Sequence, residues 1–248
     1  MDFADHFSAQ AADYARYRPG YPAAFFDWLA AQAPAHALAW DCGTGNGQAA
    51  LQLARHFDKV IATDPSTAQL AEATPHPRVH YQEAAADSTP LAEHSADLVT
   101  VAQALHWFDF DRFYAEVRRV VKPGAVIAAW TYQLPTISPA VDEVFRHFYT
   151  DITRDWWPPE RRYIDEAYQT IPFPFERIEV PAFQMRLDWE LKHLFGYLST
   201  WSATKRYEKA KGHSPLELIY EQMSAAWGDP DERKAVVWDL IVLAGRLD

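Results

Sequence analysis

The sequence predicts an α/β fold in which helices cover both faces of a doubly wound, mostly parallel sheet. Short apolar runs alternate with helical patterns over residues 37–130, and such alternation is typical of parallel strands joined by crossover helices. A glycine-rich turn follows the first run at residues 43–47, and Asp41 and Asp64 end the first two runs. Because sheets of this kind bind ligands beyond the carboxyl ends of their strands, we expect the functional site at these turns.

Five short apolar runs predict the strands of this sheet, at residues 37–41, 60–64, 79–83, 98–102 and 125–130. Apolar residues at helical spacing predict helices at 47–57 and 113–121, and Ser66 is suited to cap a further helix. The pair Pro123-Gly124 is expected to end the helix at 113–121, since both residue types break helices.

The chain changes character after Trp130. Residues 133–174 are rich in proline and aromatic residues and predict two or three helices in an insertion rather than a separate domain. Further along we expect strands at 175–180 and 183–187 and helices at 191–201 and 216–227. Residues 236–243 predict a last buried strand, although periodicity alone also fits a helix.

Charge and cysteine content exclude several classes of protein. The formal net charge is −11 and the pI is about 5.3, which argues against nucleic acid and acidic membranes as partners. Cys42 is the one cysteine, so neither an internal disulfide nor a thiolate metal cluster is expected, and no His/Asp/Glu grouping predicts a metal site. The sequence shows no signal peptide and no apolar run of about 18 residues. We therefore expect a cytoplasmic protein, monomeric or homodimeric, that acts on small molecules.

The glycine-rich turn predicts a nucleotide-like ligand. Glycines at 43, 45 and 47 let a ligand approach the backbone closely. Their spacing differs from the Gly-x-Gly-x-x-Gly of dinucleotide sites and from the phosphate-binding loop that ends in Gly-Lys-Ser/Thr. Asp64 ends the next strand about twenty residues later, where a carboxylate can bind both hydroxyls of a ribose; capping of the helix that follows is the alternative role.

Together these residues resemble the class I S-adenosylmethionine-dependent methyltransferases, and within them the type 11 small-molecule group. The resemblance runs from Phe7 to about Tyr132 and extends to branches related to trans-aconitate methyltransferase. The first motif that carries the resemblance is Tyr14 together with residues 18–22. The other motifs are residues 41–47, 63–66, 86–87, 95–99, 103–108 and 120–124. Two positions depart from the pattern, Gln48 after the last glycine and Ala96 before Asp97, and neither affects the cofactor chemistry.

The resemblance implies a Rossmann-like, seven-stranded sheet with a helical insertion over the active site. It implies one methyltransferase domain over 1–248, made of a cofactor-binding core (1–132), acceptor-side elements (133–230) and a last strand (231–248). The cofactor would be S-adenosylmethionine, which becomes S-adenosylhomocysteine. Its methionine part would lie on the glycine-rich turn, and Asp41 would orient the turn or the cofactor's amino group. The residues implied around this part are Gly43, Thr44, Gly45 and Gln103, with Tyr14 and Arg18 at the cofactor carboxylate.

The same resemblance implies the contacts of the adenosine part. Asp64 would bind the ribose hydroxyls, and Pro65 and Ser66 would lie beside the adenine. Ala86 and Asp87 would lie at the adenine edge.

The acceptor side is less defined by the sequence. His106 follows the fourth strand and is a candidate acid or base, or else a packing residue beside Trp107. An acceptor carboxylate, already ionised at neutral pH, would need no base. Aromatic residues make up 15% of the chain, and they could form either core or pocket walls. The candidate acceptor-binding residues are Trp130, Tyr132, Trp157 and Trp201. An acidic acceptor could also pair with Arg154, Arg161 or Arg162, and at least two of these three arginines are expected to be solvated.

The sequence therefore predicts an enzyme that transfers a methyl group from S-adenosylmethionine to a small molecule, such as a carboxylic acid, by direct in-line displacement. Two alternatives stay open at this point. One is a protein that binds the cofactor without catalysis. The other is a nicotinamide-dependent oxidoreductase, which the glycine spacing disfavours.

Overall fold

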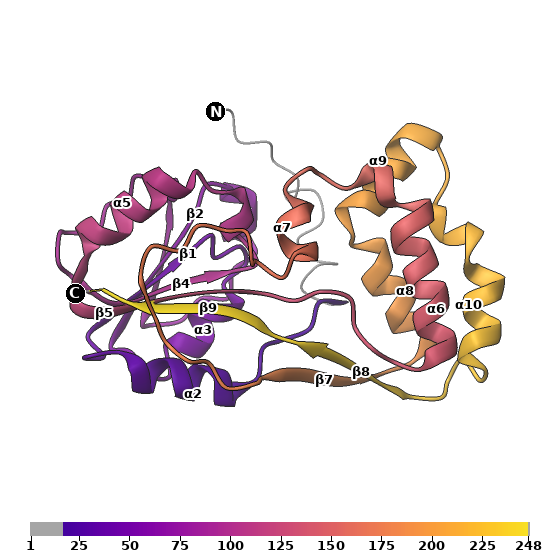
Figure 1. The fold of residues 1–248 in the computed structure, drawn as a ribbon, viewed down its shortest axis with the longest axis horizontal. Coiled ribbons are helices and arrows are strands. Elements are labelled where there is room, and N and C mark those ends of the chain that lie inside the picture. The colour runs from indigo at the N-terminus through magenta and orange to yellow at the C-terminus, as the bar shows by residue number, and fades with distance from the viewer. Residues whose placement is uncertain (1–16, 248) are drawn as a thin grey trace.

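The computed structural model describes residues 17–247 and contains a seven-stranded sheet of order β3-β2-β1-β4-β5-β9-β6 (Figure 1). The first five strands are parallel to one another, β9 is antiparallel to β5, and β6 is antiparallel to β9. The strands are β1 (Leu38–Cys42), β2 (Lys59–Asp64), β3 (Val79–Glu83), β4 (Ala96–Ala102), β5 (Val121–Thr131), β6 (Glu176–Arg177) and β9 (Ile241–Arg246). The mostly parallel seven-stranded sheet expected from the sequence is confirmed.

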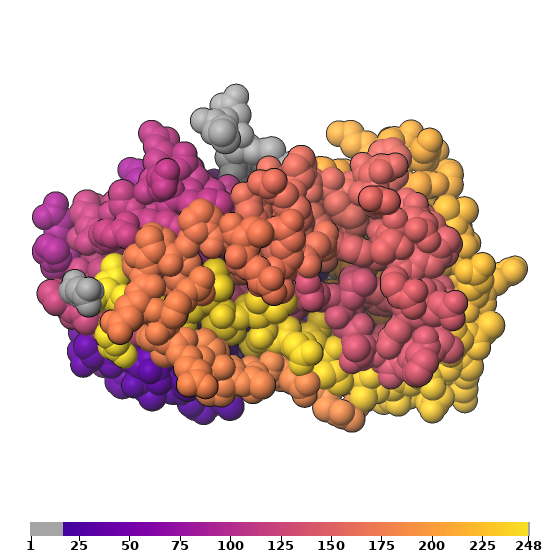
Figure 2. Space-filling view, in the orientation of Figure 1, coloured from indigo at the N-terminus to yellow at the C-terminus, as the bar shows by residue number. Residues whose placement is uncertain are grey.

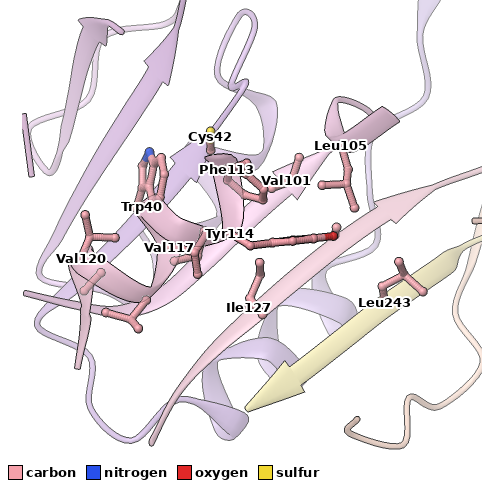
Figure 3. Close-up of a cluster of buried hydrophobic side chains, with 14 of the residues drawn as sticks. Trp40, Cys42, Val101, Leu105, Phe113, Tyr114, Val117, Val120, Ile127 and Leu243 are labelled. Atoms are coloured by element: carbon pink, nitrogen blue, oxygen red, sulfur yellow. The ribbon is translucent and has the colours of Figure 1, made fainter. Parts of the chain in front are cut away.

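Helices cover both faces of this sheet. In Figure 1, α2 (Ala23–Gln32) and α3 (Gln48–Leu53) lie on one face and α5 (Phe110–Val120) on the other. Under α5, Phe113 and Val117 pack on Trp40 of β1 and Ile127 of β5 (Figure 3). On the opposite face, α2 and α3 bury a second set of apolar side chains that includes Phe25, Phe26, Leu29, Ala50 and Leu53. Both faces of the central strands are thus buried, which explains their continuous apolar sequences.

The order of the strands identifies where a ligand would bind. From β1 the chain crosses to β2 and β3 on one side, and β4 and β5 lie on the other side. The neighbours β1 and β4 therefore form the point at which the winding direction changes, and the crevice at their carboxyl ends is the usual ligand position in such sheets. α4 (Thr67–Ala71) follows β2, and the Ser66 hydroxyl accepts the Gln69 backbone N–H at its start, as the sequence predicts.

A second group of helices adjoins the sheet at one side (Figure 1). It consists of α6 (Pro139–His147), α8 (Leu191–Ser199), α9 (Ser202–Lys211) and α10 (Tyr220–Trp227). Their shared core includes Phe145, Leu194, Trp201, Met223 and Trp227. α7 (Arg161–Asp165) lies between this helical layer and the sheet, and in Figure 2 the residues around α7 cover that side of the junction. No helix within residues 17–247 has the length and apolar character needed to cross a membrane.

Several predicted elements after Thr131 were wrong. The single strand expected at 236–243 is two strands, because β8 (Lys234–Asp239) pairs with β7 (Gln184–Trp189) in a separate two-stranded sheet, whereas β9 belongs to the main sheet. The strand expected at 175–180 is reduced to β6, and Pro181, which has no backbone N–H, follows closely. The helix α9 was not predicted, since its polar sequence gives little apolar spacing.

The helix expected to end before Pro123-Gly124 does so, but the strand that follows begins earlier than expected. α5 ends at Val120 and β5 begins at Val121, so both residues lie within the strand. The strand accommodates them because its pairing with β4 is irregular between Ala96 and Leu98, opposite this segment. Gly124 has φ of +76°, a left-handed conformation that favours glycine.

Glu116 of α5 holds the segment that follows β3. Its carboxylate accepts hydrogen bonds from the backbone N–H and the hydroxyl of Thr89, at 2.8 and 2.7 Å, and from Arg119 at 2.6 Å. Arg119 in turn donates to the carbonyl oxygens of Thr89 and Leu91. The turn containing Ala86 and Asp87 is thereby fastened to α5.

The Glu116 contacts predict a pH-dependent contribution to stability. Arg119, followed by Thr89, lowers the pKa of Glu116 from 4.5 to about 2. The pKa of Glu116 is lower in the folded protein than in the unfolded chain. Its contribution to the free energy of unfolding is therefore complete above pH 4.5 and is lost as the pH falls toward 2. We expect Glu116→Gln to lower the free energy of unfolding by about 2 kcal/mol at pH 7, and by progressively less below pH 4.5, in urea titrations. Glu143→Gln, at an exposed position of α6, is the control and should have no effect; a Glu116 effect that does not change with pH would contradict the account.

Candidate functional site

Asp41 ends β1 and is fully buried beneath the glycine-rich turn. Its two carboxylate oxygens accept hydrogen bonds from the hydroxyl groups of Thr44, at 2.5 Å, and Thr100, at 2.7 Å. Burial raises the pKa of Asp41 to about 6, although the bonds from Thr44 and Thr100 act in the opposite direction. These contacts hold the turn against β4.

The three glycines of the turn adopt left-handed backbone conformations, with φ of +67°, +56° and +87° at 43, 45 and 47. A Cβ atom at Gly43 would lie 2.6 Å from the Cβ of Ala104, and one at Gly47 would lie 2.3 Å from the Tyr81 hydroxyl. At Gly45 the one described neighbour within 4 Å is the amide oxygen of Gln69, at 3.8 Å. Gly43 and Gly47 are therefore required by packing, whereas the backbone at Gly45 leaves room for a ligand to approach.

Asp64 at the end of β2 joins the first two turns. One of its oxygens accepts the backbone N–H of Gly45 and the other that of Ser66, both at 2.9 Å. Ser66 is the residue that caps α4, so Asp64 does not take the capping role considered from the sequence. These two contacts orient the carboxylate, whose oxygens can each accept more than one hydrogen bond.

The turn after β3 lies beside Asp64. The backbone N–H of Ala84 donates to the Asp64 carbonyl at 3.3 Å, and Ala85 pairs with Ser88 across the turn that contains Ala86. The carboxylate of Asp87 lies 3.2 Å from a guanidinium nitrogen of Arg112. The turns after β1, β2 and β3 are thus connected at one edge of the sheet, as expected.

Gln103 follows β4 and has φ of +58°, which is unusual for a residue with a side chain. Its amide oxygen accepts a hydrogen bond from the Thr131 hydroxyl at 2.8 Å. Its amide nitrogen is buried and has no hydrogen-bond partner among the described residues. A buried amide nitrogen without a partner is costly, so Gln103 is a candidate for contact with a ligand.

A pocket lies where the ends of β4 and β5 meet the helical layer. Its walls are predominantly aromatic and basic. Seven residues selected from the sequence line it: Arg18, Gln103, His106, Tyr132, Trp157, Arg161 and Trp201. Residues that the sequence analysis did not assign to a site also line it, including Gln133, Leu134 and Ile164. The structure thus brings together candidates that are as far as 183 positions apart in the chain.

Of the residues expected at the acceptor site, Trp130 does not line this pocket. Trp130 is fully buried among Tyr21, Phe25 and Phe26 on the α2 face, so its assignment to the acceptor site was wrong. The reason is that Trp130 still lies within β5 beneath α2, whereas Tyr132 comes after the end of the strand. Tyr14 lies outside the described residues.

The charged side chains among the described lining of the pocket are arginines. Arg18 and Arg161 line it, and none of the described lining residues is acidic. The Nε of Arg161 donates to the Tyr149 hydroxyl at 2.8 Å and lies 3.4 Å from Asp165, and its guanidinium lies 4.5 Å from the centre of the Trp157 ring. Its two terminal nitrogens have no hydrogen-bond partner among residues 17–247. Arg154 and Arg162 do not line the pocket and are exposed, so the expectation that at least two of the three arginines are solvated is confirmed.

His106 is almost fully buried in a short helical turn after β4. Its Nδ1 lies 2.8 Å from the hydroxyl oxygen of Tyr168. Burial, followed by the charge of Arg161, lowers the pKa of His106 to about 3, so the imidazole is neutral at physiological pH. The Tyr168 contact could not have been predicted, since it joins residues 62 positions apart with no shared motif.

Comparisons with known proteins agree with this arrangement. The family described as "Methyltransferase domain" matches residues 40–129. A Dictyostelium discoideum protein whose name places it among the methyltransferases is 33% identical over 233 residues, covering 92% of this chain and 89% of that protein. A solved structure from Anaeromyxobacter dehalogenans, named for the type II methyltransferases, is 46% identical with a TM-score of 0.87, covering 93% of this chain and 98% of that one.

A more distant solved structure shares the fold. It is a Haemonchus contortus N-methyltransferase in complex with S-adenosylhomocysteine and phosphomonomethylethanolamine, 19% identical, with a TM-score of 0.51 over 99% of this chain and 60% of that one. Taken with the switch-point site, the matches establish that this chain belongs to the class I S-adenosylmethionine-dependent methyltransferases. Its methyl donor is accordingly S-adenosylmethionine.

Proposed function

We propose that this protein transfers the methyl group of S-adenosylmethionine to a small molecule that carries a carboxylate. The observation that supports this proposal is the pocket beside the cofactor turns, which contains two arginines, has aromatic walls and has no acidic residue among its described lining. A pocket of this kind favours a small anion with an apolar body. The resemblance of the sequence to trans-aconitate methyltransferases also supports an acidic acceptor.

The turns at the edge of the sheet suit the cofactor. We assign the methionine part to the backbone of Gly43, Thr44 and Gly45, since a Cβ atom at Gly45 would approach the Gln69 amide oxygen no closer than 3.8 Å. The ribose is assigned to Asp64, whose carboxylate is already oriented by two backbone N–H groups. The remaining residues of this assignment are Asp41, Pro65, Ser66, Ala86, Asp87 and Gln103, with Tyr14 and Arg18 at the methionine carboxylate.

The acceptor side is assigned to residues across the pocket. Arg161 would hold the acceptor carboxylate, because its terminal guanidinium nitrogens face no protein acceptor among the described residues. Tyr132, Trp157 and Trp201 would enclose the acceptor body and exclude water. The cofactor supplies an electrophilic methyl group, so the work of these residues is to align the acceptor with it.

A two-step binding and transfer experiment tests this function. Calorimetry should show binding of S-adenosylmethionine and S-adenosylhomocysteine and none of NAD. Transfer of a labelled methyl group should then be followed with matched small molecules: carboxylic acids, their primary amides, and amines without an acid group. We expect acids to be methylated in preference to their amides. Transfer to amides and acids at equal rates would overturn the anionic acceptor, and cofactor binding with no transfer to any compound would favour a protein that binds without catalysis.

A further inference from the structure

Tyr149 contacts the guanidinium of Arg161 but does not itself line the pocket. It lies in a π-helical turn (Phe148–Ile152) that continues α6, and the backbone N–H of Thr153 donates to the Phe148 carbonyl at 2.9 Å. Turns of this type are rare and occur frequently at functional sites. Because Arg161 lines the pocket, any effect of Tyr149 on a ligand passes through this arginine.

The hydrogen bonds of Tyr149 each have one possible direction. A guanidinium can only donate, so the Tyr149 oxygen accepts the Nε–H of Arg161, at 2.8 Å. A carboxylate can only accept, so the Tyr149 hydroxyl donates its hydrogen to Asp165. Burial raises the pKa of Tyr149 above its usual range, so the hydroxyl keeps this hydrogen at neutral pH. Tyr149 therefore bridges Arg161 to Asp165.

The bond to Tyr149 uses one edge of the guanidinium. Two parallel hydrogen bonds to a carboxylate can form along the side of a guanidinium, through Nε and one Nη nitrogen, or end-on through both Nη nitrogens. The Nε–H of Arg161 is taken by Tyr149, whereas its Nη nitrogens have no hydrogen-bond partner among residues 17–247. The end-on edge is thus the one left for a carboxylate that binds through both oxygens.

Packing limits the other orientations of this side chain. The Arg161 guanidinium lies over the rings of Trp157 and Tyr149, at 4.5 and 5.1 Å from their centres. α7 is in turn held to the segment after β5, because the side-chain amide of Gln133 donates to the Asp165 carbonyl at 2.8 Å. A side chain that is oriented before its ligand binds loses less conformational freedom on binding, which favours affinity.

We propose that Tyr149 is the positioning residue of Arg161, and that it leaves the two Nη nitrogens to bind the acceptor carboxylate end-on. Asp165 holds the Tyr149 hydroxyl in the orientation that accepts the Nε–H. The proposal rests on the proposed function and deepens it, since it names the edge of Arg161 that recognises the acceptor and the residue that selects this edge. Without the Tyr149 hydroxyl, the guanidinium keeps its charge but is free to turn, so the loss falls on acceptor binding rather than on the transfer step.

Nitrogen NMR of the arginine side chains tests the positioning without any acceptor. In protein with ¹⁵N-labelled arginine, the Nε–H signal of Arg161 is identified by its absence from Arg161→Gln. We expect this hydrogen to exchange with solvent about tenfold faster in Tyr149→Phe than in the wild-type protein, because one hydrogen bond is lost. Asp165→Asn should keep the slow exchange, since its amide oxygen still accepts from Tyr149. The exposed Arg162 is the control, and its exchange should be the same in all of these proteins.

Kinetics with a methylated acid then test the recognition. We expect Tyr149→Phe to raise KM for the acid about tenfold, to keep kcat within about twofold of the wild-type value, and to leave KM for the primary amide unchanged. Asp165→Asn should not raise KM for the acid, because it keeps the hydrogen bond and removes a negative charge 3.4 Å from the Arg161 Nε. The phenylalanine of Tyr149→Phe retains the ring that packs on Trp157 and Trp201.

Unchanged exchange of the Arg161 Nε–H in Tyr149→Phe would overturn the proposal, and so would an unchanged KM for the acid. If Asp165→Asn raised this KM as much as Tyr149→Phe does, the charge of Asp165 would orient the guanidinium, and the proposal would also fail. Should Tyr149→Phe fold poorly, Asp165→Ala takes its place: faster exchange than in Asp165→Asn supports the proposal, and equal exchange contradicts it.

Failure of the proposed function would look different. In that case no acid would be methylated, or Arg161→Gln would show no loss specific to the acid, while the NMR result would still decide whether Tyr149 positions Arg161. A loss in Arg161→Gln without one in Tyr149→Phe would instead remove this proposal alone.

Discussion

Replacing Asp64 with alanine is expected to weaken the binding of S-adenosylmethionine by about 2–3 kcal/mol, which is roughly 30- to 150-fold in Kd. The carboxylate accepts the backbone N–H groups of Gly45 and Ser66, and we assign the ribose hydroxyls to the same carboxylate. The substitution therefore removes a ligand contact and also leaves the turn at Gly45 without its anchor. Calorimetric titration with S-adenosylmethionine measures the effect.

Asp58→Ala provides the control for this prediction. Asp58 is an exposed acid just before β2, and it carries the same charge as Asp64 without lying at the turns. We expect its affinity for the cofactor to match that of the wild-type protein. An Asp64→Ala variant that remains folded, as judged by circular dichroism, and binds with unchanged affinity would refute the ribose assignment.

Replacing Arg161 with glutamine is expected to lower kcat/KM for an acidic acceptor by roughly 30- to 150-fold, equivalent to about 2–3 kcal/mol. The guanidinium lies over Trp157, is held by Tyr149 and lines the pocket, so its loss should remove the charge-assisted hydrogen bonds that we propose to the acceptor carboxylate. The effect should appear chiefly as a higher KM, and the affinity for S-adenosylmethionine should stay unchanged. Initial rates measured with the acid and with its primary amide show how much of the loss in kcat/KM depends on the acceptor carboxylate.

Arg162→Gln is the matched control, because Arg162 is the next residue along the chain and does not line the pocket. Its guanidinium contacts the Tyr163 ring and hydroxyl instead. We expect wild-type kinetics for this variant. Equal losses in the two variants would indicate a general effect of charge, and an Arg161→Gln loss as large for the amide as for the acid would contradict recognition of the carboxylate.

The cofactor half of the molecule could be predicted from sequence because its determinants are local. A buried strand, a turn and a capping residue are each encoded within a few positions, and the predicted third strand, 79–83, agrees with the observed strand. The parallel sheet then requires the turns after Asp41 and Asp64 to meet, whatever the rest of the chain does. The same local information explains why Gln103 and His106, which follow β4, were found.

The acceptor half depends on contacts between distant segments, which periodicity does not encode. Trp130 and Tyr132 are two residues apart, yet one lies in the core and the other in the pocket, because β5 ends between them. The division of residues 236–243 between two sheets likewise follows from where Leu240 lies, with its N–H bonded to the Phe183 carbonyl. Tyr168 had no distinguishing signal in sequence, since its role depends on the fold bringing it to His106.

The position of the cofactor sulfur relative to Arg161 tests the central claim most directly. A crystal structure with S-adenosylhomocysteine bound would provide it. We predict that the adenosine contacts Asp64, that the sulfur faces the pocket near Gln103 and His106, and that Arg161 makes no contact with the homocysteine carboxylate. A homocysteine carboxylate bound by Arg161 would contradict the account, because the arginine-lined pocket would then belong to the cofactor rather than to the acceptor.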